Sequence, residues 1–328
     1  MENITKKIYH FSEDPAISKG TKEFLSALNT GGPGLETLSP SDARQILVGA
    51  QNSVEIDYSG IEETERIITA DGFKITLNIV KPAGTSQILP VFIFIHGGGW
   101  ILGDYPTHKR MVHDLVVLSG AAGVFINYSP SPEAAYPQAI NQIYVATQWV
   151  AANGGEIGVD GSNMAIVGNS VGGNMSAVTA IRAKENNGPE IKLQILMWPV
   201  THATFDTESY VEYGKDRFLT TPVMKWMYDA YTTNEEERKE IYISPLNATL
   251  EQLQGLPPAL IQVAEADILR DEGEAYGRKL DEAGVITTTI RYNGMIHDFG
   301  LLNPLAHLPQ VKSLFVHAAA ELKKYLGL

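Results

Sequence analysis

From about residue 91 onwards, short apolar runs alternate with longer helical stretches, and this alternation limits the folds open to the chain. The apolar runs are 91–95, 123–128, 164–167, 191–198, 259–264 and 285–292, and the helical stretches are 107–119, 137–152, 171–185, 272–283 and 309–325. Strands that alternate with helices form a mainly parallel sheet. We therefore predict an α/β fold with a mainly parallel central sheet flanked by helices, preceded by a β-hairpin that turns at Asp71-Gly72.

Two segments lack this alternation. Residues 1–55 have a helical pattern, with an apolar stripe at Phe24, Leu25 and Leu28 and a helix-capping signal at Ser39, and no strand is expected there. Residues 202–243 are polar and aromatic without a clear strand, and they interrupt the strand–helix order. We interpret residues 202–243 as an inserted helical cap.

The amino-acid composition excludes several classes of function. The 328 residues include 25 basic and 38 acidic side chains, and the net charge of −13 disfavours nucleic acids and anionic membrane surfaces as partners. The absence of cysteine excludes disulfides, thiol nucleophiles and cysteine-ligated metals. No stretch approaches the roughly 20 apolar residues of a membrane span, and the first residues lack the apolar core of a signal peptide. We expect a soluble, cytoplasmic protein.

A candidate nucleophile lies in the sequence Gly168-Asn169-Ser170-Val171-Gly172, which follows an apolar strand and begins a helix. In this context a G-x-S-x-G sequence is typical of a nucleophile elbow, in which small flanking residues permit a sharp turn at the serine. We predict Ser170 as the nucleophile. A serine that merely caps the helix after a glycine turn is the alternative.

A glycine-rich loop ends an earlier strand, with the sequence His96-Gly97-Gly98-Gly99-Trp100. Backbone N–H groups without side chains in the way suit the oxyanion of a tetrahedral intermediate. We predict Gly98, Gly99 and Val171 as its donors. A phosphate-binding loop would require a following Lys-Ser/Thr, which this sequence lacks, and a simple glycine turn is the other alternative.

Other residues near these two motifs are expected to support the site. His96 and Gly97 are predicted to anchor the oxyanion loop and not to transfer protons. Trp100 is predicted to form the wall of a pocket or part of the core, and Asn169 is a possible pocket residue.

A serine nucleophile requires a histidine base and a carboxylate that orients the imidazole. His297 lies just after the last predicted strand, at the sheet edge where such a base belongs, whereas the other seven histidines are expected to be structural or at the surface. Asp267 is the first aspartate after the preceding strand and is our predicted acid. Asp271 is expected to cap or support the next helix, and Asp298 is expected to be too close to His297 in sequence to face its ring.

Together these motifs resemble the hormone-sensitive-lipase-like, or family IV, esterases of the α/β-hydrolase superfamily. The family's HGGG motif matches residues 96–99, its Gly-Asp-Ser-Ala-Gly-Gly elbow matches 168–173, its Asp-x-Leu-x-Asp motif matches 267–271, and its His-x-Phe motif matches 297–299. Its Tyr-Arg-Leu-Ala-Pro-Glu segment is similar to residues 128–133. The chain departs from the family at Asn169, which replaces Asp, at Val171, which replaces Ala, and at residues 129–131.

This resemblance implies a serine carboxylesterase for short- to medium-chain acyl esters that needs no cofactor and no metal. It also implies a cap built from the N-terminal segment and the insertion. The expected division is therefore 1–55 N-terminal cap segment, 56–201 first part of the α/β-hydrolase core, 202–243 cap insertion and 244–328 second part of the core. Family members are often dimers, so a homodimer is compatible with the resemblance.

Three other functions compete with this prediction. The same triad would serve an amidase, such as an arylformamidase or a peptidase. A true lipase is disfavoured because no large apolar lid is evident. A small-molecule receptor on this fold would be expected to lack the catalytic histidine, whereas His297 is present.

Overall fold

The computed structural model describes residues 8–328, which fold around one eight-stranded sheet in the order β1-β2-β4-β3-β5-β6-β7-β8. The strands are β1 (Ile61–Ala70), β2 (Phe73–Pro82), β3 (Leu89–Ile95), β4 (Ala122–Asn127), β5 (Val159–Asn169), β6 (Ile191–Met197), β7 (Ala259–Ala266) and β8 (Thr287–Ile296). The β1–β2 and β2–β4 pairs are antiparallel, and all other pairs are parallel. The predicted α/β fold, with its mainly parallel sheet and its early hairpin, is confirmed.

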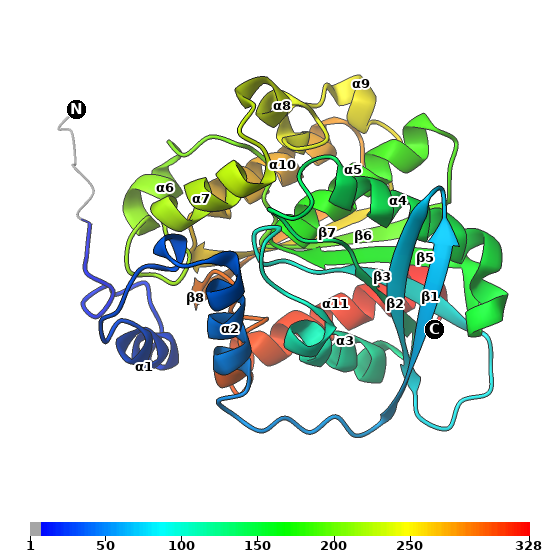
Figure 1. The fold of residues 1–328 in the computed structure, drawn as a ribbon, viewed down its shortest axis with the longest axis horizontal. Helices are drawn as coiled ribbons and strands as arrows, with labels where there is room; N and C mark the ends of the chain where they lie inside the picture. Colours follow the sequence, from blue (N-terminus) through cyan, green and yellow to red (C-terminus); the bar gives the residue numbers. More distant parts are fainter. Residues whose placement is uncertain (1–7) are drawn as a thin grey trace.

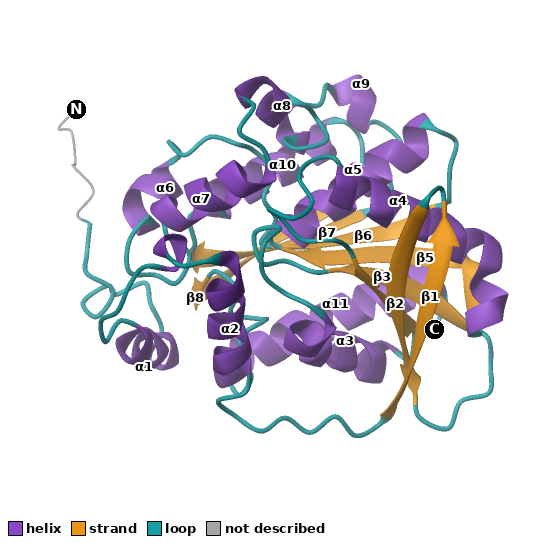
Figure 2. Cartoon of the chain, in the orientation of Figure 1, coloured by secondary structure: helices purple, strands orange, loops and turns teal. Residues whose placement is uncertain are grey.

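Helices cover both faces of this sheet (Figure 1, Figure 2). They are α1 (Lys19–Leu28), α2 (Pro40–Gln51), α3 (Tyr105–Ser119), α4 (Gln138–Asn153), α5 (Val171–Glu185), α6 (Glu208–Tyr213), α7 (Thr221–Tyr231), α8 (Glu235–Lys239), α9 (Leu250–Leu253), α10 (Arg270–Glu282) and α11 (Pro309–Leu326). Helices α3 and α11 pack on one face, and α4, α5 and α10 lie on the other. Among residues 8–328, no helix combines the length and the apolar composition that crossing a membrane requires.

The central strands form the core because they are apolar on both faces, as parallel strands covered by helices must be. Every residue of β3 except Pro90 is buried, whereas β1 at the sheet edge is mostly exposed. Several strands are longer than the sequence predicted, and β5 and β8 extend furthest beyond the expected ends. Strand β5 begins at Val159, five residues before the predicted start, which was missed because most of these first residues are polar. Strand β8 continues through the Asn293-Gly294 turn signal to Ile296.

The two segments without strands lie near each other, beside the carboxyl ends of the parallel strands (Figure 1). Residues 202–243 contain α6, α7 and α8, and residues 8–55 contain α1 and α2. A buried ion pair joins the segments, with Arg217 Nη2 2.8 Å from Asp14 Oδ2. The expectation of no strand in the N-terminal segment needs one correction, since Ile17 forms an isolated parallel bridge with Gly294.

Candidate active site

Ser170 lies at the sharp turn between β5 and α5, with φ of 54° and ψ of −123°. A side chain at Gly168 would collide with the backbone of Gly172, and one at Gly172 would collide with the carbonyl oxygen of Ile95. Glycine at these two positions therefore allows the turn to pack against β3. Two backbone hydrogen bonds hold Ser170 in this conformation. Ser170 N donates to Met197 O (2.9 Å), and Asn174 N donates to the backbone carbonyl oxygen of Ser170 (3.1 Å).

The structure brings Ser170, His297 and Asp267 together from three separate loops. Ser170 Oγ lies 3.0 Å from His297 Nε2, and His297 Nδ1 lies 2.7 Å from Asp267 Oδ2. Asp267 Oδ1 accepts a hydrogen bond from Leu269 N (3.0 Å), which fixes the carboxylate. This geometry suits a neutral imidazole that donates from Nδ1 to Asp267 and accepts the Ser170 proton at Nε2.

The three residues are nearly enclosed, with exposed fractions of 4% for Ser170, 2% for His297 and 1% for Asp267. Burial lowers the pKa of the His297 imidazole, but the charges of Asp267 and Asp298 and the hydrogen bond to Asp267 outweigh this effect. The pKa of His297 is therefore raised above its usual value. Enclosure strengthens each of these electrostatic interactions because little water screens them.

The expectation that Asp298 would not face the imidazole is wrong. Asp298 adopts φ of 58°, and this left-handed backbone turns its carboxylate back, so that Oδ2 lies 3.8 Å from His297 Nε2. Asp298 Oδ1 accepts hydrogen bonds from Trp198 Nε1 (2.8 Å) and from Asn169 Nδ2 (3.2 Å). Burial raises the pKa of the Asp298 carboxyl, although His297, Trp198 and Asn169 oppose that rise.

Asn169 was expected as a pocket residue, but it is fully buried and connects two loops of the site. Its Oδ1 accepts a hydrogen bond from Gly97 N (2.9 Å), while its Nδ2 donates to Asp298. Asn169 therefore links the oxyanion loop to the loop that carries His297. An aspartate here, as in the family motif, could not donate the second of these hydrogen bonds.

The glycine-rich loop leaves backbone donors unused. Gly98 and Gly99 have φ of 97° and 61°, which only glycine adopts readily. Gly98 O accepts hydrogen bonds from Ile101 N (3.1 Å) and Leu102 N (2.8 Å), and this closes the turn. Within residues 8–328, the N–H groups of Gly98, Gly99 and Val171 donate to no hydrogen bond, so these predicted donors are available to an oxyanion.

His96 anchors the start of this loop. Its Nδ1 lies 2.8 Å from Gly97 O, and its ring stacks on Tyr128 with centroids 4.1 Å apart. Tyr128 also donates from its hydroxyl to His96 O (3.0 Å). Burial lowers the pKa of His96 to about 4, so the ring stays neutral near pH 7 and holds the loop in place.

Helix α7 of the insertion covers the glycine-rich loop. Trp100 is fully buried and stacks on Tyr231 of this helix, with ring centroids 4.3 Å apart. Met227 packs on Gly99 so closely that a side chain there would collide with the methionine sulfur. Trp100 thus belongs to the contact between loop and helix.

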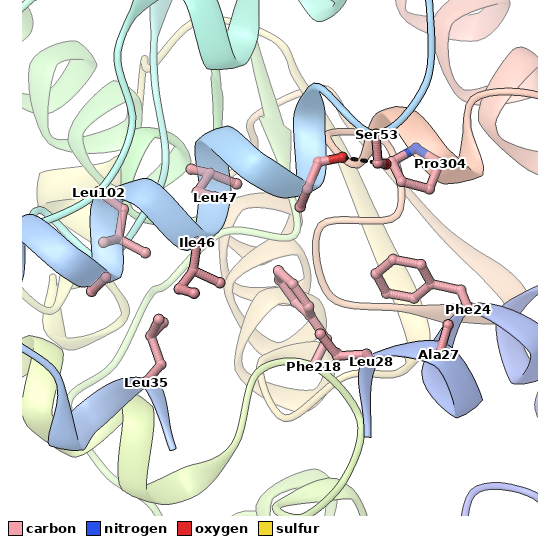
Figure 3. A pocket seen from close by; sticks show the side chains of 12 residues that line it. Phe24, Ala27, Leu28, Leu35, Ile46, Leu47, Ser53, Leu102, Phe218 and Pro304 are labelled. Atoms are coloured by element: carbon pink, nitrogen blue, oxygen red, sulfur yellow. Dashed lines mark hydrogen bonds between the residues drawn. The ribbon is translucent and has the colours of Figure 1, made fainter. Parts of the chain in front are cut away.

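An apolar pocket of about 250 Å³ lies between α1 and α2, beside the glycine-rich loop (Figure 3). Its lining residues are Phe24, Ala27, Leu28, Leu35, Ala43, Ile46, Leu47, Ala50, Ser53, Leu102, Phe218 and Pro304. Leu102 connects the pocket to the oxyanion loop, because its N–H bonds to Gly98 O. Of the aromatic residues in the insertion, Phe218 lines this pocket.

The described residues offer no evident place for a metal. Within residues 8–328, no three histidine, aspartate or glutamate side chains cluster in a way that could hold an ion. The carboxylates of Asp267 and Asp298 instead face the imidazole of His297.

Comparison with known proteins identifies the group to which this site belongs. Residues 92–301 match a family described as the alpha/beta hydrolase fold. The chain is 34% identical to carboxylesterase NlhH of Mycobacterium tuberculosis over 250 residues, which cover 74% of this chain and 77% of that protein. It is 29% identical to an ethyl acetate hydrolase of Pseudomonas putida over 236 residues, which cover 71% and 74% of the two chains.

A solved structure matches almost the whole chain. The crystal structure of a thermostable esterase from Pseudomonas putida ECU1011 superposes with a TM-score of 0.95 at 57% sequence identity, covering 96% of this chain and 99% of the esterase. The match extends through the N-terminal segment and the insertion. The protein is a carboxylic ester hydrolase, and the chain belongs to the α/β-hydrolase fold family, among its hormone-sensitive-lipase-like esterases.

Proposed function

We propose that the protein is a serine carboxylesterase that hydrolyses short- to medium-chain acyl esters through Ser170, His297 and Asp267. The observation that carries the proposal is the unbroken hydrogen-bonded chain from Ser170 Oγ through both imidazole nitrogens to the Asp267 carboxylate. A serine hydroxyl becomes an effective nucleophile when such a base accepts its proton.

In the first step, His297 Nε2 takes the Ser170 proton while Oγ attacks the ester carbonyl carbon. Asp267 keeps the Nδ1 proton in place and stabilises the imidazolium that forms. The carbonyl oxygen becomes an oxyanion and receives hydrogen bonds from the N–H groups of Gly98, Gly99 and Val171. Loss of one such donor lowers kcat by roughly a hundredfold or more, about 3 kcal/mol.

In the second step, His297 gives its proton to the leaving alcohol, and the tetrahedral intermediate collapses to an acyl-enzyme on Ser170. A water molecule then enters, His297 takes a proton from it, and the resulting hydroxide attacks the acyl carbonyl. The same oxyanion donors stabilise the second tetrahedral intermediate. Its collapse releases the carboxylic acid and returns the proton to Ser170.

The apolar pocket supports the preference for shorter chains. Its volume of about 250 Å³ lies below the roughly 300–1,000 Å³ typical of pockets for drug-sized ligands, which suits a short hydrocarbon chain. Its lining includes Leu102, whose N–H bonds to Gly98 O of the oxyanion loop, and we therefore assign the acyl chain to this pocket. The relative that is named an ethyl acetate hydrolase is consistent with small esters.

We also propose the expected division of the chain for this enzyme. The N-terminal segment 1–55 and the insertion 202–243 would form the cap, and 56–201 with 244–328 would form the core. The Arg217–Asp14 pair and the hydrogen bond from Asn29 Nδ2 to Asp216 O (3.2 Å) between the two segments support this division.

The test is hydrolysis of p-nitrophenyl esters from acetate to palmitate, with a p-nitroanilide of matched chain length. Wild type should favour the shorter esters, and Ser170→Ala should fall to background. Ser162→Ala, an exposed serine of β5, is the matched control and should keep full activity. Turnover of the anilide alone would place the protein among amidases. Full activity of Ser170→Ala would refute the triad, and tight binding without turnover would favour a receptor.

A further inference from the structure

Helix α2 carries an arginine that reaches the oxyanion loop from the N-terminal segment. Arg44 Nε donates to Ile101 O (2.8 Å), and Nη2 donates to Ser131 O (3.0 Å). The guanidinium also pairs with Glu133 through two parallel bonds, Nη1 to Oε1 at 2.8 Å and Nη2 to Oε2 at 2.7 Å. One side chain therefore joins three segments that are far apart in sequence.

The two carbonyl contacts distinguish this arginine from an ordinary surface ion pair. The side chain of Arg44 is 27% exposed and that of Glu133 is 58% exposed, and exposed pairs add little stability. Ile101 and Ser131 are buried, so their carbonyl oxygens depend on protein donors. Only the planar guanidinium fork can serve both carbonyls and a carboxylate together, which lysine cannot do.

The contacted carbonyls lie at the positions that shape the oxyanion loop. Ile101 N donates to Gly98 O (3.1 Å), so fixing Ile101 also fixes the peptide of a predicted oxyanion donor. Ser131 N donates to Trp100 O (2.8 Å), so the second carbonyl contact holds the neighbouring segment against the same loop. The side of this turn that faces α2 is thus held by Arg44.

The same helix lines the apolar pocket. Ala43 and Leu47, on either side of Arg44 in sequence, face the pocket together with Leu102 of the loop (Figure 3 labels Leu47 and Leu102). At its C-terminal end, Gln51 donates from Nε2 to Leu301 O (3.0 Å), in the segment that follows His297. Helix α2 is therefore anchored near both the oxyanion loop and the histidine loop.

We propose that Arg44 is a positioning residue that holds the oxyanion loop in its active geometry through the Ile101 carbonyl. The N-terminal segment then contributes to catalysis as well as to substrate binding. This inference rests on the proposed triad and oxyanion hole, because the loop matters only if its N–H groups stabilise the transition state. A small displacement of such donors lowers the rate without weakening ground-state binding.

The test compares Arg44→Lys with Arg66→Lys on p-nitrophenyl butyrate. Arg66 pairs with Glu156 on the exposed surface at 3.1 Å and is the matched control. Arg44→Lys should lower kcat by about tenfold, less than deletion of a donor itself, while KM changes less than about twofold. Arg66→Lys should match wild type. A raised KM with unchanged kcat would overturn the inference, because α2 would then only line the pocket.

A second variant and a second readout guard against loss of folding. Glu133→Gln leaves the guanidinium on Ile101, so its kcat should fall less than that of Arg44→Lys. Inhibition by a trifluoromethyl ketone, which forms an oxyanion on the serine, should weaken in Arg44→Lys by about the factor lost in kcat. Unchanged inhibition would refute the role of Arg44. The triad is tested separately, since Ser170→Ala activity would refute it whatever Arg44 does.

Discussion

Asp298→Asn removes a buried charge beside His297 while preserving the local hydrogen bonds. The amide oxygen of the new asparagine can accept from both Trp198 Nε1 and Asn169 Nδ2, as Asp298 Oδ1 does now. Asp267 is then the carboxylate whose charge still raises the pKa of His297. The substitution therefore isolates the effect of one carboxylate at 3.8 Å from Nε2.

The size of the effect follows from that distance. A unit charge about 4 Å away contributes about 4 kcal/mol at an effective dielectric constant of 20, and measured pKa shifts from such neighbours are about 1 to 3 units. We expect the pKa of His297 to fall, because one of the two carboxylates that raise it loses its charge. Because His297 must be neutral to act as base, the acid limb of kcat/KM should move to lower pH. The plateau of kcat should fall by roughly tenfold, since the imidazolium of the transition state loses the same stabilisation.

The stability of the folded protein should rise in Asp298→Asn, whereas kcat falls. The raised pKa of Asp298 means that the folded protein holds its proton more tightly than the unfolded chain does, so stability is lost as pH rises through that pKa. Asp298→Asn avoids this loss. The variant should be more stable than wild type at pH 7, with the difference in the free energy of unfolding vanishing near pH 3.

The measurements are pH profiles of kcat/KM between pH 4 and 9 and urea unfolding at pH 3 and 7. Asp281→Asn, an exposed aspartate at the end of α10, controls for a change of net charge and should leave the profile unchanged, since solvent and salt screen surface charges. An acid limb that stays in place in Asp298→Asn would refute the electrostatic role given to this carboxylate.

Three other substitutions probe the same region. Asn169→Asp would place a carboxylate against Asp298, where Asn169 Nδ2 now donates a hydrogen bond of 3.2 Å, so the two carboxylates must share a proton. Urea unfolding should therefore show that the stability of this variant falls as pH rises above about 4. Gly99→Ala would place a methyl group against Met227 at a φ of 61°, so kcat for butyrate should drop at least tenfold; wild-type kcat would contradict the close packing. Ala43→Leu would fill part of the apolar pocket and should lower kcat/KM for octanoate more than for acetate; equal losses would mean that acyl chains bind elsewhere.

The fold was predictable where local signals agree with long-range packing. Helix α5 spans the predicted residues Val171–Glu185, and the hairpin turns at Asp71-Gly72 as expected. The extension of β8 was not predictable, because Asn293-Gly294 has the composition of a turn. Gly294 instead bridges Ile17 of the N-terminal segment, and such a contact between distant residues leaves no trace in either local pattern.

The candidate site was predictable to the extent that loops after parallel strands meet at one edge of the sheet. That rule and the order of the motifs selected Ser170, Asp267 and His297, which the structure brings together. Asp298 was excluded by an argument that assumed ordinary backbone angles, and its φ of 58° reverses the conclusion. Arg44 could not be found, because its partners are 57 or more residues away and no motif includes it.

The backbone conformation of Ser170 makes the active enzyme less stable than an inactive variant that has glycine at this position. Its φ of 54° is uncommon for any residue with a side chain, and such conformations cost on the order of 1–3 kcal/mol. A glycine at this position would relax that conformation without needing the turn to move, so Ser170→Gly should melt a few degrees above Ser170→Ala. Selection for turnover therefore acts against thermal stability at this residue, and it is the surrounding packing that allows the strained serine to persist.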